Sequence, residues 1–295
     1  MTTLNLGNLA TFRLVVQRGS FSAAADALGI SLPAVSLQVR QLEQFLQTRL
    51  LERTGRGIKA TAAGMALLAH SEQIDRVVNS AVQSVSAFSQ EVNGSLTLGT
   101  GATACIHLLP PLLQHLRQQH PLLTVGVTTG NTLDVVRAVE ENRLDLGLVT
   151  LPVQGRSLAV TAVVDEEFVV IHPSQEAGIP AVCTPEELQA LPLIAFEAGS
   201  GTRDLIERWF RSAGLAVTPV MQLGSIEAIK RMVRAGLGYS IVPRMAVEQA
   251  EDRYGLTVHS LAPSLYRQLA VVMRQDKVIT KGMAEMLRLL QAVRL

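Results

Sequence analysis

The stretch between Ser22 and Glu43 constrains the fold more than any other, because it predicts two short helices joined by a tight turn. An alanine-rich run follows Ser22, which can cap a helix, and Gly29 ends the run, since glycine readily adopts the left-handed conformation found just after helices. Ser31 then caps a second helix, with Pro33 in its first turn, where a missing amide proton costs nothing.

The second of these helices has two different faces. Val35, Val39, Leu42 and Leu46 recur at helical spacing and form one buried stripe. A helix pair that leaves one face uncovered is typical of the helix-turn-helix, in which the second helix enters the major groove of DNA. An ordinary helical hairpin inside a larger core would show the same spacing. The uncovered face consists of Leu32, Pro33, Ser36, Leu37, Arg40 and Gln44.

Further residues extend this pattern on both sides of the helix pair. They are Leu9 and Phe12; the run Gly19-Ser20-Phe21-Ser22 with Ala24, Ala25 and Leu28; the run Pro33-Ala34-Val35-Ser36 with Gln38, Val39, Leu42 and Glu43; and finally Leu50-Leu51-Glu52-Arg53, Thr61 and Gly64. In this order the chain resembles the N-terminal domain of the LysR-type transcriptional regulators, and its length of 295 residues also suits that family. The resemblance implies a regulator that binds double-stranded promoter DNA and a small-molecule effector. It further implies a homodimer that assembles into a homotetramer, and it leaves room for a contact with RNA polymerase.

Two residues on the uncovered face depart from the family pattern. Glutamine is usual where Leu32 stands, and a basic or polar residue where Leu37 stands. Leucine cannot donate a hydrogen bond to a base edge, so it can make only apolar contacts, for instance with the methyl group of thymine. We therefore expect Ser36 and Arg40 to carry more of the DNA recognition. The alternative is that both leucines pack against neighbouring protein.

Positive charge is concentrated at the N-terminal end of the chain. Residues 1–65 hold seven Lys or Arg against three acids, a net of +4, which leaves −3 for the remainder of a chain whose total is +1. This asymmetry fits DNA bound at one end only. Arg53, Arg56 and Lys59 surround two glycines and predict a wing whose cations reach phosphates or a minor groove, although a solvated basic loop is the plain alternative. The expected DNA-binding residues are Ser22, Ser31, Leu32, Pro33, Ser36, Leu37, Arg40, Arg53, Arg56 and Lys59.

A long helix is predicted from Thr61 to about Val92. From Ile74 onward its apolar residues alternate between spacings of four and three, a heptad seam that favours pairing with another helix. The family's linker helix dimerises, which implies two recognition helices about one turn of DNA apart. Packing of the helix on its own domain is the alternative. The seam consists of Leu67, Ile74, Val78, Ala81, Val85, Phe88 and Val92.

After Asn93 the pattern changes to short apolar strands that alternate with helices, which predicts a parallel sheet with crossover helices. The first such set includes a helix over Ile106–His120. A second set starts near Glu167 and includes a strand over Val217–Gln222, and the strand Leu269–Arg274 returns to the first sheet.

The expected fold class is therefore α/β, with an N-terminal winged helix-turn-helix and a long linker helix. The resemblance adds a C-terminal effector domain of two α/β lobes, similar to periplasmic binding proteins. The expected domains are residues 1–64 for DNA binding, 65–92 for the linker and 93–295 for the effector domain, with lobe I at 93–163 plus 267–295, lobe II at 164–266, and hinge strands near Thr161–Asp165 and Leu261–Tyr266.

Four polar, glycine-containing loops follow strands of the effector domain and begin helices. They are Thr100–Thr103, Thr128–Thr132, Gly199–Arg203 and Gly224-Ser225. Ligands of parallel α/β lobes bind at such loops, and the amides and hydroxyls of helix N-termini suit an anion, so we expect a small anionic effector such as an organic acid or oxyanion. Each loop on its own is most simply a helix cap.

Arg203 can add a bidentate grip on a carboxylate, or it can instead bridge to Asp204 or Glu207 of its own helix. The run Gly199–Arg203 resembles the branch of the family that senses metabolites of carbon, nitrogen and sulfur assimilation, which also implies that Ile226 lines the cleft. The expected effector-binding residues are Thr100, Gly101, Ala102, Thr103, Asn131, Thr132, Ser200, Gly201, Thr202, Arg203 and Ile226.

Other functions lack their motifs in this sequence. No Ser/His/Asp elbow, phosphate-binding Walker loop or paired-carboxylate site is present, so we expect no catalytic residue and no enzyme. The six histidines are scattered, and we expect no metal and no cofactor. Cys105 and Cys183 favour two buried reduced thiols over a redox-sensing pair.

With neither an apolar run of membrane-span length nor a signal peptide, we expect no membrane association and a cytoplasmic protein. The missing signal peptide and the basic wing also argue against a solute-binding or buffering protein.

Overall fold

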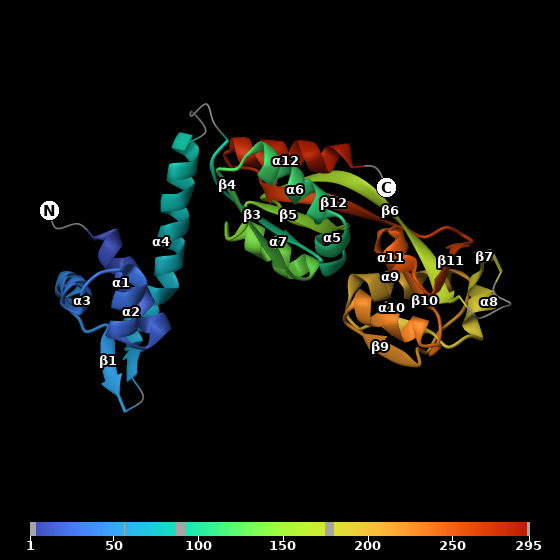
Figure 1. The fold of residues 1–295 in the computed structure, drawn as a ribbon, viewed down its shortest axis with the longest axis horizontal. Coiled ribbons are helices and arrows are strands. Elements are labelled where there is room, and N and C mark those ends of the chain that lie inside the picture. Colours follow the sequence, from blue (N-terminus) through green and yellow to red (C-terminus); the bar gives the residue numbers. More distant parts are fainter. Residues whose placement is uncertain (1–3, 56, 87–91, 175–179, 294–295) are drawn as a thin grey trace. The chain divides into compact units, whose positions relative to one another are not determined.

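The computed structural model describes residues 4–55, 57–86, 92–174 and 180–293 (Figure 1). The chain forms two compact units, residues 1–82 and 83–295. The first unit contains three short helices, a two-stranded hairpin and the greater part of a long helix. Its elements are α1 (Leu6–Arg18), α2 (Phe21–Leu28), α3 (Leu32–Leu46), β1 (Leu51–Thr54), β2 (Gly57–Ala60) and α4 (Ala62–Ser86).

The turn between α2 and α3 forms largely as its residues predict. Gly29 adopts the left-handed conformation with φ 65°, and the Ser31 hydroxyl accepts a hydrogen bond from the Ala34 amide at 3.3 Å. The predicted cap at Ser22 is wrong. Ser20 is extended and its hydroxyl accepts from the Ala23 amide, so α2 begins two residues earlier than expected and Ser22 lies within its first turn.

The core of the first unit is formed by the apolar faces of α1 and α3. Val35, Val39 and Leu42 are buried as their spacing predicts, and they pack with residues of α1 in two adjoining clusters. The start of α4 packs on the same core through Leu67 and Ile74. That part of the predicted heptad seam therefore belongs to the unit's own interior, which was the alternative prediction.

The remainder of the seam has a different environment. Val78, Ala81 and Val85 of α4 are exposed, whereas Phe88 lies outside the described residues and Val92 is not helical.

Among the described residues no single helix is long and apolar enough to cross a membrane. The pair α2 and α3, which is bent by 107°, has the length and composition of a membrane span only when the two helices are taken together.

The second unit contains two lobes. In lobe I the strands β4, β3 and β5 are parallel, and β12 pairs antiparallel between β5 and β6. The predicted helix Ile106–His120 is two helices that meet at Leu108, with Pro110 and Pro111 in the first turn of the second one. The elements are β3 (Gly94–Thr100), α5 (Ala102–His107), α6 (Leu109–Gln119), β4 (Leu123–Thr129), α7 (Thr132–Glu140), β5 (Leu146–Thr150), β6 (Leu158–Pro173), β12 (Tyr266–Arg274) and α12 (Lys281–Ala292).

Lobe II is built around the second half of β6, to which β10 and β11 pair antiparallel. A separate parallel pair, β8 with β9, lies in the same lobe, and β9 begins at Met221 rather than at Val217 as predicted. The elements are β7 (Val182–Cys183), α8 (Pro185–Gln189), β8 (Ile194–Phe196), α9 (Gly201–Ser212), β9 (Met221–Leu223), α10 (Ile226–Arg234), β10 (Ser240–Pro243), the 3-10 helix η1 (Arg244–Val247), α11 (Ala250–Arg253) and β11 (Leu256–Leu261).

One continuous strand joins the two lobes. β6 is 16 residues long, and Figure 1 shows it running from lobe I into lobe II. It pairs with β12 from Glu167, opposite Tyr266, to Leu158, opposite Arg274. The expected hinge Thr161–Asp165 lies within this strand. The loops that begin helices in each lobe therefore flank a shared β6–β12 ladder.

Candidate functional sites

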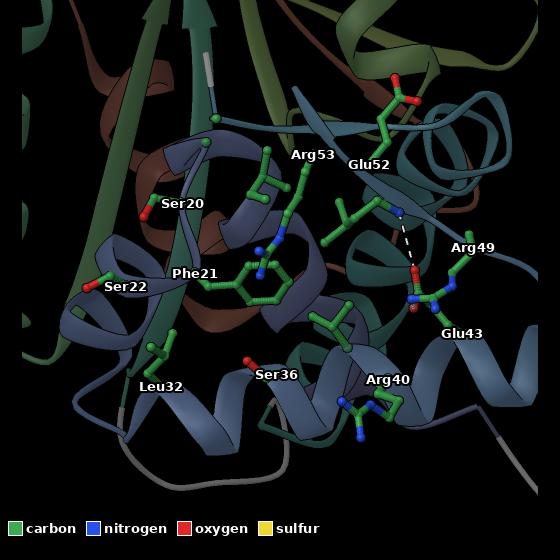
Figure 2. Close-up of a pocket in the computed structure, with 15 residues that line it drawn as sticks. Ser20, Phe21, Ser22, Leu32, Ser36, Arg40, Glu43, Arg49, Glu52 and Arg53 are labelled. Atoms are coloured by element: carbon green, nitrogen blue, oxygen red, sulfur yellow. Dashed lines mark hydrogen bonds and ion pairs between the residues drawn. The ribbon is translucent and has the colours of Figure 1, made fainter. Parts of the chain in front are cut away.

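A groove of about 770 Å³ lies between α3 and the β1–β2 hairpin (Figure 2). Figure 2 shows Leu32, Ser36 and Arg40 following one another along α3, while Phe21 and Arg53 point into the groove. The residues that line it are Gly19, Ser20, Phe21, Ser22, Leu32, Ser36, Val39, Arg40, Glu43, Arg49, Leu51, Glu52, Arg53, Gly57 and Ile58.

Two sets of contacts fix the hairpin relative to the helices. The Glu43 carboxylate at the end of α3 accepts hydrogen bonds from the Leu50 amide at 2.8 Å and the Leu51 amide at 3.3 Å. The Ile58 amide donates to the Gly19 carbonyl at 2.9 Å. Gly57 stands beside this bond with φ 124°, and a Cβ there would lie 2.8 Å from the Gly19 oxygen, so the hairpin requires glycine at this position.

The predicted DNA-facing residues of the first unit lie at its surface. Leu32 is 47% exposed and Leu37 is 54% exposed, so neither packs into the protein. Arg40, Arg53 and Lys59 are exposed as well, and they form no ion pair with any described residue. Ser22, Ser31 and Pro33 are exposed, Ser36 is half-buried, and Arg56 lies outside the described residues. Arg49 and Glu52 also line the groove, although the sequence did not single them out.

A second cavity, of about 380 Å³, lies between the two lobes. Nine of the eleven residues predicted to bind an effector line it. Its remaining lining residues come from the same loops and from the strands β5, β8 and β12. The nine are Thr100, Gly101, Ala102, Thr103, Asn131, Thr132, Ser200, Gly201 and Thr202; the others include Thr129, Thr150, Phe196, Glu197, Gly224 and Arg267.

Two predicted effector residues lie elsewhere. The buried Arg203 side chain donates from Nε to Glu207 Oε1 at 2.5 Å. This contact is the alternative prediction, in which Arg203 bridges to an acidic residue of its own helix. Ile226 is buried in the core of lobe II. Arg203 directly follows the lining residue Thr202, and Ile226 lies two positions after the lining residue Gly224, but the helical turn directs both side chains into the lobe rather than toward the cavity.

Some hydroxyls of the cavity already bond within the protein. Thr100 Oγ1 donates to the Leu148 carbonyl at 3.0 Å, and Ser200 Oγ donates to the Glu197 carbonyl at 3.0 Å. Asn131 Oδ1 accepts from the Asp134 amide at 2.8 Å and caps α7. These side chains therefore shape the loops, whereas the hydroxyls of Thr103 and Thr132 have no hydrogen bond with a described residue and remain available to a ligand.

Arg267 is the cation of this cavity, and no local sequence motif indicated it. Its guanidinium donates from Nε to Glu166 Oε2 at 2.5 Å and from Nη1 to Thr202 Oγ1 at 3.0 Å, and it lies 5.3 Å from the centre of the Phe168 ring. Arg267 and Glu166 stand opposite each other in the β12–β6 ladder. Burial raises the pKa of the Glu166 carboxyl, and the Arg267 charge and hydrogen bond oppose this rise.

The two cysteines are not paired with each other. Cys183 is buried in β7, and burial together with the nearby Glu187 carboxylate raises the pKa of its thiol to about 11. Cys105 is half-buried in α5. In the part of the chain that the structure describes, no group of three His, Cys, Asp or Glu side chains is placed to hold a metal ion.

Comparison with known proteins matches both units to one family. Residues 6–65 match the model of the bacterial regulatory helix-turn-helix protein, lysR family, and residues 89–294 match the LysR substrate binding domain. The chain is 31% identical to the HTH-type transcriptional regulator YofA of Bacillus subtilis, over 94% of each chain. It is 30% identical to the regulator CbbR of Xanthobacter flavus, over 95% of this chain and 86% of that one.

The solved structures give the same fold. The full-length regulator CbnR, in complex with its target DNA, superposes with a TM-score of 0.74 at 22% identity, covering 97% of this chain and 99% of that one. The relatives are named as transcriptional regulators rather than enzymes. The helix-turn-helix with its hairpin, the two-lobed α/β domain and the family matches lead to one conclusion: this chain belongs to the LysR family of DNA-binding transcriptional regulators.

Proposed function

We propose that this regulator binds specific promoter sequences through α3 and the hairpin, under control of a small anion bound between the effector lobes. The observation that carries the proposal is the inter-lobe cavity, in which helix N-termini, threonine hydroxyls and Arg267 converge. The proposed domains are residues 1–64, 65–92 and 93–295, with the two lobes divided as the sequence predicts. Such a regulator acts in the cytoplasm, where promoter DNA and RNA polymerase are found.

On the DNA side, we assign base and phosphate contacts to the groove of Figure 2 and its surroundings. Arg40 lies on the exposed face of α3, where a guanidinium can bind a guanine or a phosphate. Arg53 and Lys59, with Arg56, would contact phosphates or the minor groove beside the hairpin. The other contacts belong to Ser22, Ser31, Leu32, Pro33, Ser36 and Leu37.

Arg40→Ala tests this assignment directly. An operator is first selected from random DNA with the full-length protein, and affinity is then measured by fluorescence anisotropy. We expect Arg40→Ala to weaken operator binding by about tenfold or more, because one good guanidinium contact contributes on the order of 1–3 kcal/mol. Arg208→Ala, an exposed arginine of α9 without an ion pair to a described residue, is the matched control and should bind as wild type does. If both variants bound the operator with equal affinity, Arg40 would not belong to the DNA interface.

The two exposed leucines of α3 suggest that thymine methyl groups are read. Leu32 and Leu37 offer apolar surface and no hydrogen-bond donor at the face that enters the groove. Replacing single thymines of the selected operator by deoxyuridine removes only the methyl group. We expect one or two such positions to weaken the wild-type protein but not Leu32→Ala or Leu37→Ala. If no thymine is sensitive, the leucines do not read methyl groups.

On the ligand side, an effector can shift the regulator only if it binds one arrangement of the lobes better than another. The proposed residues are Thr100, Gly101, Ala102, Thr103, Asn131, Thr132, Ser200, Gly201 and Thr202, joined by Arg267 in place of Arg203 and Ile226. A thermal-shift screen of the full-length chain against carboxylates, oxyanions and phosphorylated compounds tests this site. We expect one series to raise the melting temperature in the wild type and not in Thr202→Ala. A rise that survives in Thr202→Ala would put the ligand elsewhere.

A further inference from the structure

Among the described residues that line the inter-lobe cavity, two are charged, and their charges are opposite. Arg267 comes from β12, and Glu197 from the loop between β8 and α9. The other lining residues are threonines and one serine, one asparagine, glycines and apolar residues. Because Arg267 is already paired with the buried Glu166, a ligand with only negative charge would meet one compensated cation and one uncompensated carboxylate.

The Glu197 side chain is exposed, and its carboxylate lies beside Gly224 in the wall of the cavity. A Cβ built on Gly224, which also lines the cavity, would lie 2.8 Å from Glu197 Oε2 and 3.1 Å from Oε1, so the carboxylate rests directly over that glycine. The backbone beneath it is held on both sides: the Glu197 amide donates to the Leu223 carbonyl at 3.1 Å, and its carbonyl accepts from Ser200 Oγ at 3.0 Å. No described residue forms an ion pair or hydrogen bond with this carboxylate.

Arg267 and the start of α9 supply the positive charge and the hydrogen-bond donors of this cavity. The guanidinium uses Nε for Glu166 and Nη1 for Thr202, and Nη2 makes no hydrogen bond with a described residue. Gly201 and Thr202 lie in the first turn of α9, where backbone amides have no partner within the helix. A carboxylate fits between these donors, with charge-assisted hydrogen bonds to the guanidinium.

We infer that the ligand of this cavity is a zwitterion of the α-amino acid class, its carboxylate bound by Arg267 and the α9 amides and its ammonium bound by Glu197. The inference rests on the proposed function, which locates an effector between the lobes. A volume of about 380 Å³ is near the lower end of the range for small-molecule sites, about 300–1,000 Å³, and suits an amino acid better than a nucleotide. Glu197 is then the residue that separates amino acids from simple carboxylates.

The test compares matched compounds on the full-length protein. The twenty L-amino acids are screened by thermal shift, each beside the carboxylate that lacks its α-amino group, such as succinate for aspartate, glutarate for glutamate and propionate for alanine. Affinities of those that bind are then measured by isothermal titration calorimetry. We expect at least one amino acid to bind about tenfold or more tightly than its deaminated partner, since a charge-assisted hydrogen bond distinguishes them.

Glu197→Gln should remove that preference, weakening the amino acid about tenfold and leaving its deaminated partner as tight or tighter. Gly224→Ala displaces the carboxylate by its new methyl group and should weaken the amino acid in the same way. The matched control is Glu186→Gln, an exposed residue of α8 outside the cavity, which should retain the preference.

The possible results distinguish a failure of the zwitterion inference from a failure of the proposed function. If deaminated carboxylates or oxyanions bind as tightly as any amino acid, and Glu197→Gln changes nothing, the zwitterion inference is overturned while an anion site remains. If no amino acid, carboxylate or oxyanion binds at all, the proposed ligand class fails together with the inference.

Discussion

Arg267 and Glu166 form a buried ion pair of the effector domain, and substitution of each residue separates the contribution of Arg267 from the cost of burying the Glu166 charge. Arg267→Ala would leave the Glu166 carboxylate buried without its counter-charge, at a cost on the order of 3–5 kcal/mol. Burial already raises the pKa of Glu166, and losing Arg267 removes the two influences that oppose that rise. A carboxyl whose pKa is higher in the folded state is tolerated at low pH and becomes destabilising as pH increases through that pKa.

We therefore expect the melting temperature of Arg267→Ala to fall further below that of the wild type at pH 8 than at pH 5. The double variant Arg267→Ala with Glu166→Gln should recover part of the loss at pH 8, because glutamine carries no charge to bury. Differential scanning calorimetry measures both effects. Equal melting temperatures for the single and double variants at pH 8 would mean that the buried charge is not what destabilises the protein.

The structure shows why glycine is needed at position 64, three residues after Thr61. The Thr61 hydroxyl accepts from the Gly64 amide at 3.0 Å at the start of α4, and a Cβ on Gly64 would lie within 2.1 Å of the Leu50 carbonyl oxygen. Gly64→Ala must push backbone apart and should destabilise the first unit by upward of about 2 kcal/mol. Gly55→Ala, where the added methyl meets nothing within 4 Å, is the control. Thermal melts followed by circular dichroism would contradict this if both variants matched the wild type.

The helix α5 of lobe I meets α10 and α11 of lobe II through a charged cluster around the buried Lys230. Lys230 is fully buried, and its ammonium lies 2.8 Å from Glu227 Oε1 and 2.6 Å from Asp252 Oδ1. His107 Nε2 lies 3.3 Å from Glu227 Oε1. Burial lowers the pKa of the His107 imidazole, and the Lys230 charge lowers it further.

A depressed histidine pKa means that the folded state holds the neutral ring, so this contribution to stability is present above about pH 6.5 and is lost as pH falls through the folded pKa. Lys230→Met should raise the pKa of His107, because it removes one cause of the depression and leaves the two carboxylates that favour the imidazolium. Titration of the His107 ring by NMR measures the change. A pKa that stays constant or falls in Lys230→Met would show that Lys230 does not act on His107.

Elements defined by local sequence were easier to predict than elements defined by distant partners, and the reason is physical. Caps and periodic apolar residues lie within a few positions of each other, so α3 and α7 could be located from local sequence alone. The strand β6 was only partly found, because its 16 residues are defined by partners as distant as Tyr266 and Leu256. The same holds at the cavity, where the loops were predicted but Arg267 was not, since its partner Glu166 is close only in the folded sheet.

The exposed end of α4 suggests how the regulator assembles. Val77, Val82 and Val85 are 67%, 62% and 72% exposed, an apolar surface that a second copy of the helix would cover in a homodimer and thence a homotetramer. We expect Val82→Glu to lower the mass measured by light scattering and to weaken operator binding. Val278→Glu, an exposed valine of the effector domain, is the control. A mass unchanged by Val82→Glu would mean that other surfaces hold the assembly.

A ligand bound between the lobes should change how the protein binds DNA. A DNase I footprint on the selected operator, with and without the compound that most raises the melting temperature, tests it most directly. We expect the ligand to change the length or the hypersensitive positions of the footprint in the wild type and not in Thr202→Ala. An identical footprint at saturating ligand, with binding established by calorimetry, would show that the ligand does not control DNA binding.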